Sequence, residues 1–345
     1  MSDPLHDAVQ QAIAADAWTD AVFEDLARRL FAHQFAGCAP YRRFCEGRGV
    51  TPDTLVDIDA IPAVPTDVFK TVPLATFPPE DAVATFLTSG TTVGTRGRHL
   101  LRRLDTYEAS LAPWLRTWLA PDDEPLVLAL APSFEDDPHS SLGYMISWAV
   151  EHVGAPGSRH CFTADGPDLA AFEDAIGDGP VLVLATARAL QHALETRLAA
   201  GPLPLPPGSR VMETGGFKGA TRTLSREDFY AGLATGFAIP EAAIISEYGM
   251  TELGSQGYAR GQRELVFPPW CRVSAVDPDT LGVLPDGQRG LLRFVDLVNV
   301  DSVIAVQTAD VGVVTPKGVL LEGRAPGSTP RGCSLAVDEI LRGVS

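Results

Sequence analysis

Four short apolar runs, separated by segments with helical periodicity, constrain the fold of this 345-residue chain more than any other feature of its sequence. The runs are PLVLALAP at 125–132, VLVLAT at 181–186, RVMETGG at 210–216 and AIISEYG at 243–249. Continuous apolar runs of this kind suit parallel strands that are buried on both faces. Helices are expected before and between them, at 105–119, 143–153, 187–200 and 225–236. This alternation predicts an α/β fold with a mainly parallel sheet.

The two ends of the chain differ from this middle part. Near the N-terminus Thr19 is a predicted helix cap, and the helix is expected to run to about Phe35 and to end at Gly37. Its apolar face is expected to consist of Val22, Phe23, Leu26, Leu30 and Phe31. After residue 265 short strands separated by turns predict a β-rich subdomain over 266–335. We therefore expect a single domain over 1–345, whose α/β portion spans 1–265.

Charge and cysteine content argue against several classes of protein. The net charge of −17 repels nucleic-acid backbones and anionic membrane surfaces, so no nucleic-acid partner is expected. The five cysteines form no C-x-x-C pair, which argues against a metal site or a disulfide framework and favours a reducing compartment. The N-terminus lacks a signal peptide, and no apolar run approaches the roughly 20 residues that span a bilayer. We expect a cytoplasmic protein without a membrane span.

The segment LTSGTTVGTRGRH, from Leu87 to His99, has the composition of a phosphate-binding loop. Its glycines let the backbone turn N–H groups toward an anion, and its hydroxyl groups add hydrogen-bond donors. Arg96 or Arg98 adds a positive charge. No G-K-[ST] sequence follows, so the segment is not a Walker A loop. A flexible turn is the alternative interpretation.

The segment SEYGMTELGSQ, from Ser246 to Gln256, follows an apolar run, and α/β enzymes place their sites at the carboxyl ends of strands. Tyr248 offers a flat ring for a purine, Thr251 a hydroxyl group, and Glu252 a hard oxygen ligand for Mg²⁺. A strand end followed by a helix cap is the alternative.

Three further segments carry candidate binding residues. METGGFKG contains paired glycines that allow close approach of a ligand, and its Lys218 could meet a phosphate. In QTADVG, Asp310 could bind two ribose hydroxyls, although an aspartate in a turn is commonly structural. In LLEGRAPGSTPRGCSL, Arg324 and Arg331 flank a turn, and Cys333 lies beside Arg331.

In this order, the segments resemble the motifs of the adenylate-forming superfamily. TSGTTVGTRG matches its phosphate loop, YGMTE its Y-G-x-T-E signature, TAD its T-G-D motif with Ala309 in place of glycine, and EGR its following G-R. Within the superfamily the chain looks most like the LuxE-type acyl-protein synthetases, the long-chain-fatty-acid–protein ligases. Its short length and the segments ETGGFKG, EYGMTELGSQ and RGCSL carry that closer likeness. Phenylacetate-CoA ligases are the next most similar group.

The resemblance implies a role for each matched residue. The triphosphate would be bound by Ser89, Gly90, Thr91, Thr92 and Gly94. The adenine would be flanked by Tyr248, Gly249 and the backbone of Gly215 and Gly216. Thr251 would lie near the α-phosphate, Glu252 would hold Mg²⁺, and Asp310 would bind the ribose with Arg324 close by. Arg96 stands nearest to the lysine that usually ends the phosphate loop. Only 21 residues follow Arg324, so the C-terminal lid of larger relatives is expected to be absent.

The implied cofactors are ATP and Mg²⁺, and the implied substrate is a carboxylic acid, with a fatty acid favoured. The carboxylate would attack the α-phosphorus of ATP, and the acyl group would then pass to a thiol of an acceptor protein, a reductase or a carrier protein. Cys333 is the candidate intermediate thiol, because the nearby Arg331 could raise its thiolate fraction. An acyl-CoA or aryl-CoA ligase of the phenylacetate-CoA ligase type is one alternative. A non-catalytic nucleotide-binding partner subunit is another.

The segment SSLGYMISW at 140–148 is open to two interpretations. Its small polar residues could line a carboxylate entry, with Tyr144, Met145 and Trp148 bordering an acyl tunnel. A plain amphipathic core helix explains the same residues equally well.

Overall fold

A computed structural model describes residues 3–88, 96–121, 124–215, 224–261, 263–325 and 331–342. The chain forms two compact units. Unit 1 comprises residues 1–112, 250–256 and 266–345, and unit 2 comprises residues 113–249 and 257–265. The chain thus passes from unit 2 to unit 1 at 265/266, where the sequence predicted that a β-rich subdomain begins. It also passes between the units within the YGMTE segment, between Gly249 and Met250. The single-domain organisation stays a prediction.

Unit 2 is built on a mainly parallel sheet, as the apolar runs predicted. Its six strands are β4 (Leu126–Leu130), β5 (Arg159–His160), β8 (Val181–Thr186), β9 (Arg210–Thr214), β10 (Ile244–Tyr248) and β11 (Gly257–Arg260). They are ordered β11-β10-β9-β8-β4-β5, and only the pairing of β10 with β11 is antiparallel. A two-stranded ribbon, β6 (Phe162–Thr163) and β7 (Gly166–Pro167), lies outside this sheet.

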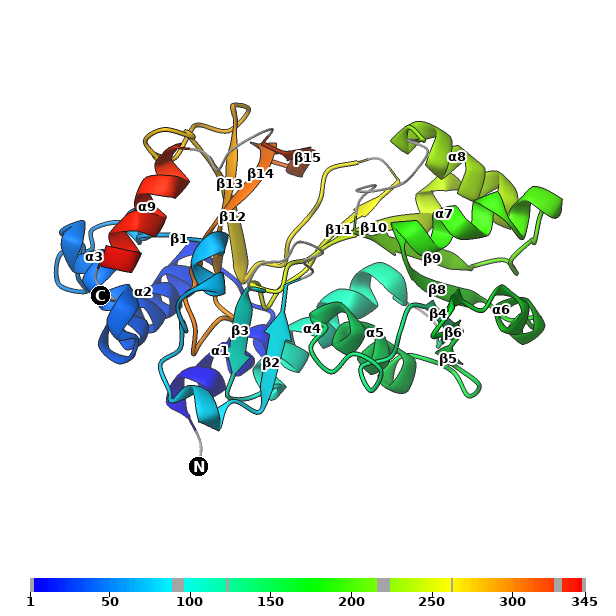
Figure 1. Cartoon of the computed structure of the whole chain (residues 1–345), viewed down its shortest axis with the longest axis horizontal. Helices are drawn as coiled ribbons and strands as arrows, with labels where there is room; N and C mark the ends of the chain where they lie inside the picture. The colour runs from blue at the N-terminus through cyan, green and yellow to red at the C-terminus, as the bar shows by residue number, and fades with distance from the viewer. Residues whose placement is uncertain are drawn as a thin grey trace. The chain divides into compact units, whose positions relative to one another are not determined.

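Helices cover both faces of this sheet (Figure 1). They are α5 (Ser141–His152), α6 (Leu169–Ala175), α7 (Ala187–Glu195) and α8 (Arg226–Phe237), with short 3-10 turns η4 (Leu198–Ala200) and η5 (Glu241–Ala243). Alternate residues of β4, β8, β9 and β10 pack with α6, α7 and α8 into one apolar core, which includes Val183, Val211, Phe229, Leu233 and Ile244. On the other face Tyr258 of β11 contacts Met145 of α5. The two-sided burial explains why the strand sequences are continuously apolar.

Unit 1 contains the predicted β-rich part. Its main sheet consists of β1 (Val64–Pro65), β12 (Cys271–Val276), β13 (Arg289–Asp296), β14 (Ala305–Thr315) and β15 (Gly318–Arg324). The pairs β12–β13, β13–β14 and β14–β15 are antiparallel, and β1 adds to β14 in parallel. A separate hairpin of β2 (Ala84–Leu87) and β3 (Arg98–Leu101) flanks the candidate phosphate loop.

The helices of unit 1 come from both ends of the chain. They are α1 (Pro4–Ala15), α2 (Asp20–Gly37), α3 (Ala39–Gly47) and α9 (Arg331–Arg342), with 3-10 turns η1 (Ile58–Ala60), η2 (Thr66–Lys70) and η3 (Pro79–Asp81). The predicted cap of α2 is confirmed, since the Thr19 side chain accepts a hydrogen bond from the backbone N–H of Val22. Phe23, Leu26, Leu30 and Phe31 are buried as expected. Val22 is 36 % exposed, because it falls outside the buried stripe of α2, which runs through Phe23, Ala27 and Gln34.

The division of the chain into units falls within one helix, α4 (Asp105–Leu119), between Ala112 and Pro113. Among the described helices, none combines the length and apolar character needed to cross a bilayer.

Candidate functional site

The segment Met250–Gln256, which carries Thr251 and Glu252, is held by hydrogen bonds from several elements of unit 1. Nδ1 of His99, on β3, lies 2.7 Å from the Thr251 carbonyl oxygen. The side-chain amide of Asn299 donates to the Glu252 carbonyl oxygen at 2.8 Å. The sequence positions of these partners lie 152 and 47 residues away from the segment. The backbone that presents Thr251 and Glu252 is therefore fixed by tertiary contacts.

Asp296, at the end of β13, holds the other end of the same segment. Its Oδ2 accepts the backbone N–H groups of Gly254 and Ser255, each at 2.9 Å, and its Oδ1 accepts the Ser255 hydroxyl at 2.8 Å. Complete burial raises the pKa of Asp296 to about 6, and these donors act in the opposite direction. A buried carboxyl with this many donors is a structural clamp.

Glu252 is suited to a metal ion in its burial and charge environment. Its side chain is only 6 % exposed. Burial raises the pKa of Glu252 to about 7, while its own backbone N–H and the charges of Arg324 and Lys70 lower it. A divalent cation would favour the ionised carboxylate there. Among the described residues Glu252 thus fits the expected Mg²⁺ ligand, and its metal binding stays a prediction.

The described ends of the candidate phosphate loop are joined to each other. Thr88 and Gly97 are linked by two hydrogen bonds, Thr88 N to Gly97 O at 2.9 Å and Gly97 N to Thr88 Oγ1 at 2.8 Å. Arg96 donates its Nε to the Thr88 carbonyl at 2.7 Å and its Nη2 to the Leu87 carbonyl at 3.2 Å. The guanidinium of Arg96 thus links the two described ends of this segment. Its expected contact with phosphate stays a prediction.

Several predicted loop residues are not part of the described chain. Ser89, Gly90, Thr91, Thr92 and Gly94 lie outside the described residues, as do Gly216 and Lys218 of the second glycine segment. The side chain of Arg331 also lies outside them.

Asp310 and Arg324, the predicted ribose-binding pair, face each other across the β14–β15 ladder. They are register partners, and Nε of Arg324 lies 3.4 Å from Oδ1 of Asp310. Arg324 is half-exposed, so this surface ion pair contributes little to stability. The resemblance implied that Arg324 lies close to Asp310, and this proximity is confirmed. Their binding of ribose stays a prediction.

In unit 2, the predicted adenine-binding residues lie at the carboxyl ends of the adjacent parallel strands β9 and β10. Gly215 follows β9 with a φ of 95°, and a Cβ there would meet nothing within 4 Å. Tyr248 is half-buried at the end of β10, and the exposed Gly249 follows it. An exposed glycine beside an aromatic ring suits a flat ligand, as expected for this edge of a parallel sheet.

Two buried glutamates at the same strand ends were missed by sequence reasoning. Thr214 donates its hydroxyl to Oε2 of Glu247, and Tyr230 donates to Oε1 of Glu213 at 2.8 Å. Burial raises the pKa of Glu247 to about 7, a hydrogen bond from Thr214 lowers it, and the charge of Glu213 adds to the rise. The signal for them in the sequence was the presence of a carboxylate within each of two otherwise apolar strands.

Cys333, the predicted acyl-carrying thiol, is buried in the first turn of α9. It is 2 % exposed and packs against Val276, Leu291 and Val311. Burial raises the pKa of the Cys333 thiol to about 11, and the charge of Asp67 contributes to the rise. A buried, protonated thiol is a poor nucleophile, so acylation of Cys333 requires a change in this environment. All five cysteines are free and buried.

The segment 140–148 forms the first part of α5. Ser140 caps the helix by accepting the Gly143 N–H at 2.9 Å, and Met145 and Ile146 are buried. Tyr144 packs edge-on against Phe134, with ring centroids 5.0 Å apart. These contacts fit the core-helix interpretation, and the tunnel stays a prediction.

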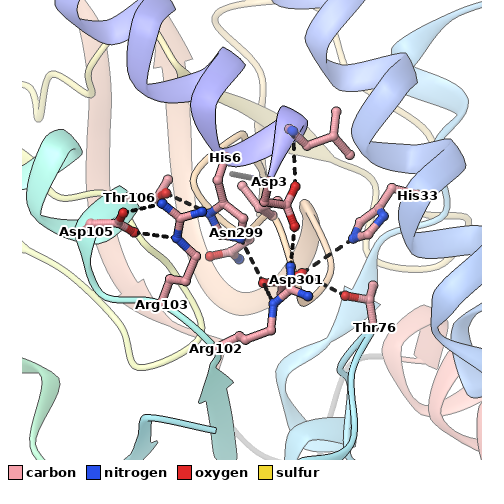
Figure 2. A network of polar contacts seen from close by, with 12 residues as sticks. Asp3, His6, His33, Thr76, Arg102, Arg103, Asp105, Thr106, Asn299 and Asp301 are labelled. Atoms are coloured by element: carbon pink, nitrogen blue, oxygen red, sulfur yellow. Dashed lines mark hydrogen bonds and ion pairs between the residues drawn. The ribbon is translucent and has the colours of Figure 1, made fainter. Parts of the chain in front are cut away.

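A second polar cluster in unit 1, centred on Asp301, also contains potential metal ligands. Asp301, His6 and Asp3 present atoms within 4.8 Å of one another. However, Arg102 already donates to both aspartates, and His6, His33 and Thr76 also contact Asp301 (Figure 2). The guanidinium supplies the positive charge that a metal would bring. The cluster therefore ties α1, α2 and β3 to the 297–303 loop.

A cavity of about 30 Å³ borders this cluster, with His99, Tyr107, Gly254 and Asp301 among its lining residues. Nucleotide sites are roughly ten times larger, whereas a cavity of this size accommodates water. The cavity is therefore not a substrate site.

Sequence comparisons place these features in a known family. The sequence model of the family "Acyl-protein synthetase, LuxE" matches residues 7–138 and 202–342. The long-chain-fatty-acid–luciferin-component ligase of Vibrio harveyi is 24 % identical over 91 % of this chain and 86 % of its own length. The ligase of the same name from Aliivibrio fischeri is 25 % identical over 92 % of this chain and 88 % of its own.

Solved structures show the same fold. A 2-hydroxyisobutyryl-CoA ligase bound to 2-HIB-AMP and CoA matches with a TM-score of 0.64 and 17 % identity, over 90 % of this chain and 67 % of that one. ATP-bound MatB from Rhodopseudomonas palustris matches with a TM-score of 0.51 and 17 % identity, over 72 % of this chain. This chain spans 49 % of the MatB chain. The predicted adenylate-forming fold is confirmed. The expected ligase class is confirmed by the family model and by the two relatives. Because the family model covers most of the sequence, the chain belongs to the LuxE acyl-protein synthetase family.

Proposed function

We propose that the chain uses ATP and Mg²⁺ to convert a fatty acid into its acyl-adenylate, and then transfers the acyl group to a thiol of an acceptor protein. The observation that carries this proposal is the fixed Thr251–Glu252 backbone, held by His99, Asn299 and Asp296 within a chain of this family. The names of the relatives support a long-chain acid and a protein acceptor.

In the first step a carboxylate oxygen of the acid forms a bond to the α-phosphorus of ATP. The bond from that phosphorus to the bridging oxygen breaks, and pyrophosphate leaves with the electron pair. Mg²⁺ would supply charge neutralisation for the phosphates when bound at Glu252. The residues of the chain contribute mainly position and fixed charge, because phosphoryl and adenylyl transfers need little proton chemistry.

In the second step a thiolate attacks the carbonyl carbon of the acyl-adenylate, and AMP leaves. Cys333 is the proposed first acceptor, and a thiol of the partner protein is the second. This step follows adenylate formation, since the acyl-adenylate is its substrate. Because burial raises the pKa of Cys333, we expect it also to require local movement of α9 that exposes the thiol. The acceptor is a reductase or carrier protein. A cytoplasmic location fits the five free cysteines.

The test is ATP–pyrophosphate exchange by the purified chain with Mg²⁺ and a panel of aliphatic and aromatic acids. We expect long-chain acids to stimulate exchange, and Glu252→Gln to abolish most of it. Glu80→Gln, which changes an exposed glutamate of η3, is the matched control and should exchange as the wild type does.

Two results would contradict the proposal. Exchange that is absent with every acid, in a chain shown to bind ATP, would indicate a non-catalytic nucleotide-binding subunit. Rapid release of free acyl-CoA when CoA is added, without labelling of any protein by radioactive acid, would indicate a CoA ligase.

A further inference from the structure

Lysine is rare in this chain, and one of its lysines lies next to the candidate phosphate loop. Of 27 lysine and arginine residues only three are lysines, namely Lys70, Lys218 and Lys317. Lys317 lies in the exposed turn between β14 and β15, and Lys218 lies outside the described residues. Lys70 is the last residue of η2.

The position of η2 is set by its two buried residues. Val68 and Phe69 are essentially inaccessible to solvent, whereas the Lys70 side chain is 47 % exposed. The Phe69 ring meets the His99 ring edge-on, with centroids 6.1 Å apart. A Cβ atom built on Gly97 would lie 3.5 Å from the Cβ of Phe69. The turn that carries Lys70 therefore packs directly against the end of the loop and the start of β3.

The same turn also reaches the segment that carries the predicted metal ligand. The His99 ring, which Phe69 contacts, has its Nδ1 atom 2.7 Å from the carbonyl oxygen of Thr251, the residue before Glu252. The Nζ atom of Lys70 lies 2.6 Å from Oδ1 of Asp67, so the ammonium group is oriented by its own turn. One exposed cation is thus carried by a turn that packs against the loop end and, through His99, is linked to the Thr251–Glu252 backbone.

The loop's own arginine is already engaged. Arg96 donates to the carbonyl oxygens of Leu87 and Thr88, which leaves fewer of its N–H groups for a ligand. Lysine differs from arginine in being a compact charge on a flexible stem, able to move between partners. The Lys70 ammonium can leave Asp67 for a more highly charged anion while Arg96 keeps its contacts with Leu87 and Thr88.

We propose that Lys70 binds the phosphate chain of ATP and neutralises negative charge on the departing pyrophosphate. This assignment rests on the proposed function, since it describes one contact of the adenylation site. When the bond between the α-phosphorus and the bridging oxygen breaks, pyrophosphate takes the electron pair, and the Lys70 ammonium offsets part of the new charge without transferring a proton. Asp67 holds the side chain in place before ATP binds.

The first experiment compares Lys70→Met, Lys70→Arg and the matched control Lys317→Met. We expect Lys70→Met to lower kcat/KM for ATP in pyrophosphate exchange by about 10- to 100-fold. This loss is somewhat smaller than the loss caused by removing one preorganised donor from a buried active site, because Lys70 is half-exposed. Lys70→Met should also weaken ATP binding in equilibrium titration. Lys70→Arg should recover part of both, and Lys317→Met should match the wild type. Thermal unfolding should be unchanged, because the Lys70 side chain is half-exposed.

The second experiment uses an ATP analogue whose terminal phosphate carries a reactive acyl group, which acylates lysines close to the phosphates. Peptide mass spectrometry should find Lys70 acylated and protected by excess ATP, whereas Lys317 should be neither. This readout separates two failures. A wild type that shows no exchange overturns the proposed function, while ATP-protected acylation of Lys70 would still support the phosphate contact. Normal exchange by Lys70→Met, or acylation of Lys218 without Lys70, overturns the assignment of Lys70.

Discussion

The Nδ1 atom of His99 lies 2.7 Å from the backbone carbonyl oxygen of Thr251. A carbonyl oxygen only accepts, so the ring nitrogen must donate, and this contact selects the tautomer that carries its proton on Nδ1. Burial lowers the pKa of His99 to about 4, and the bond to Thr251 opposes that shift. The ring is therefore neutral near pH 7. It joins the strand that leaves the candidate phosphate loop to the turn that presents Glu252.

Replacing His99 should affect both stability and adenylation. His99→Leu leaves the Thr251 carbonyl without its donor, and we expect a loss of about 1–3 kcal/mol in the free energy of unfolding. Exchange should fall through kcat more than through the KM for ATP, because the backbone position of Thr251 changes while the loop remains. His192→Gln, at an exposed position of α7, is the control. Equal urea midpoints for His99→Leu and the wild type would contradict this role.

The close packing of Gly254 predicts a strong effect of adding one methyl group. A Cβ atom at Gly254 would lie 2.4 Å from Cγ1 of Val298. Gly254→Ala should therefore destabilise unit 1 by about 1–3 kcal/mol, as overpacking does. Adding Val298→Ala should recover part of that loss. Gly177→Ala, where a Cβ atom meets nothing within 4 Å, is the control and should change stability little. Similar denaturation midpoints for Gly254→Ala and Gly177→Ala would show the prediction to be wrong.

The Asp301 cluster predicts sensitivity of the fold to acid. Burial alone would raise the pKa of Asp301, but hydrogen bonds from His33, His6 and Thr76 and the charge of His6 hold it well below its usual range. A lowered pKa in the folded state contributes stability above the unfolded-state pKa near 3.9, and this stability is lost as the pH falls below that value.

Asp301→Asn should therefore be destabilised by about 3–5 kcal/mol at pH 7, since it leaves Arg102 and the histidines without their shared carboxylate. Its stability should also fall less than that of the wild type between pH 5 and pH 3. Urea unfolding across this range measures both effects. Asp53→Asn, at an exposed position, is the control, and parallel pH profiles of wild type and Asp301→Asn would contradict the linkage.

Glu247 predicts a pH dependence of the opposite sign. Burial raises the pKa of Glu247 from 4.5 to about 7. A carboxyl group with a raised folded-state pKa contributes stability that is complete below its unfolded pKa and is lost as the pH rises through the folded value. Glu247→Gln should therefore be more stable than the wild type by about 1–3 kcal/mol at pH 8, with little difference at pH 4. A stability difference that does not change between these two pH values would refute this assignment.

Cys333 predicts a separation of the two chemical steps. Cys333→Ser should keep acid-dependent pyrophosphate exchange, because the thiol takes no part in the attack on the α-phosphorus. It should lose the thioester-linked acyl label, which alkaline hydroxylamine releases from the wild type. Cys161→Ser, a buried cysteine of unit 2, should retain the label. A label that survives in Cys333→Ser would assign the acyl group to another residue.

Much of the fold was predictable from local patterns. The helix that starts after Thr19, the four apolar parallel strands of unit 2 and the helices expected near 143–153 and 225–236 lie where periodicity and capping residues placed them. The helix expected over 187–200 ends at Glu195, and α6 was not predicted. Val22 is an instructive error, because it was assigned to the apolar face of α2 although it falls outside the stripe of residues that is buried. An apolar period shows that a helix has a buried face but does not fix the edges of that face.

The candidate site was predictable as a set of segments and not as an arrangement. Motif order identified Thr251, Glu252, Asp310 and Arg324 as candidates, because each motif is a property of neighbouring residues. The contacts of His99, Asn299 and Asp296 with 251–255 were not readable, since their partners are 41 to 152 residues away in the sequence. The engagement of Arg96 with its own loop and the burial of Cys333 likewise followed only from the folded chain.

The sequence alone thus determined the α/β class, the main elements and the family-level chemistry, because helix caps, apolar periods and motifs act over a few residues. Tertiary structure decided which side chains hold Thr251 and Glu252, and it placed Lys70 beside the loop end. It also made the Cys333 thiol a protonated, buried group. These outcomes depend on burial and on long-range pairing. Both arise only when distant segments meet and water is excluded between them.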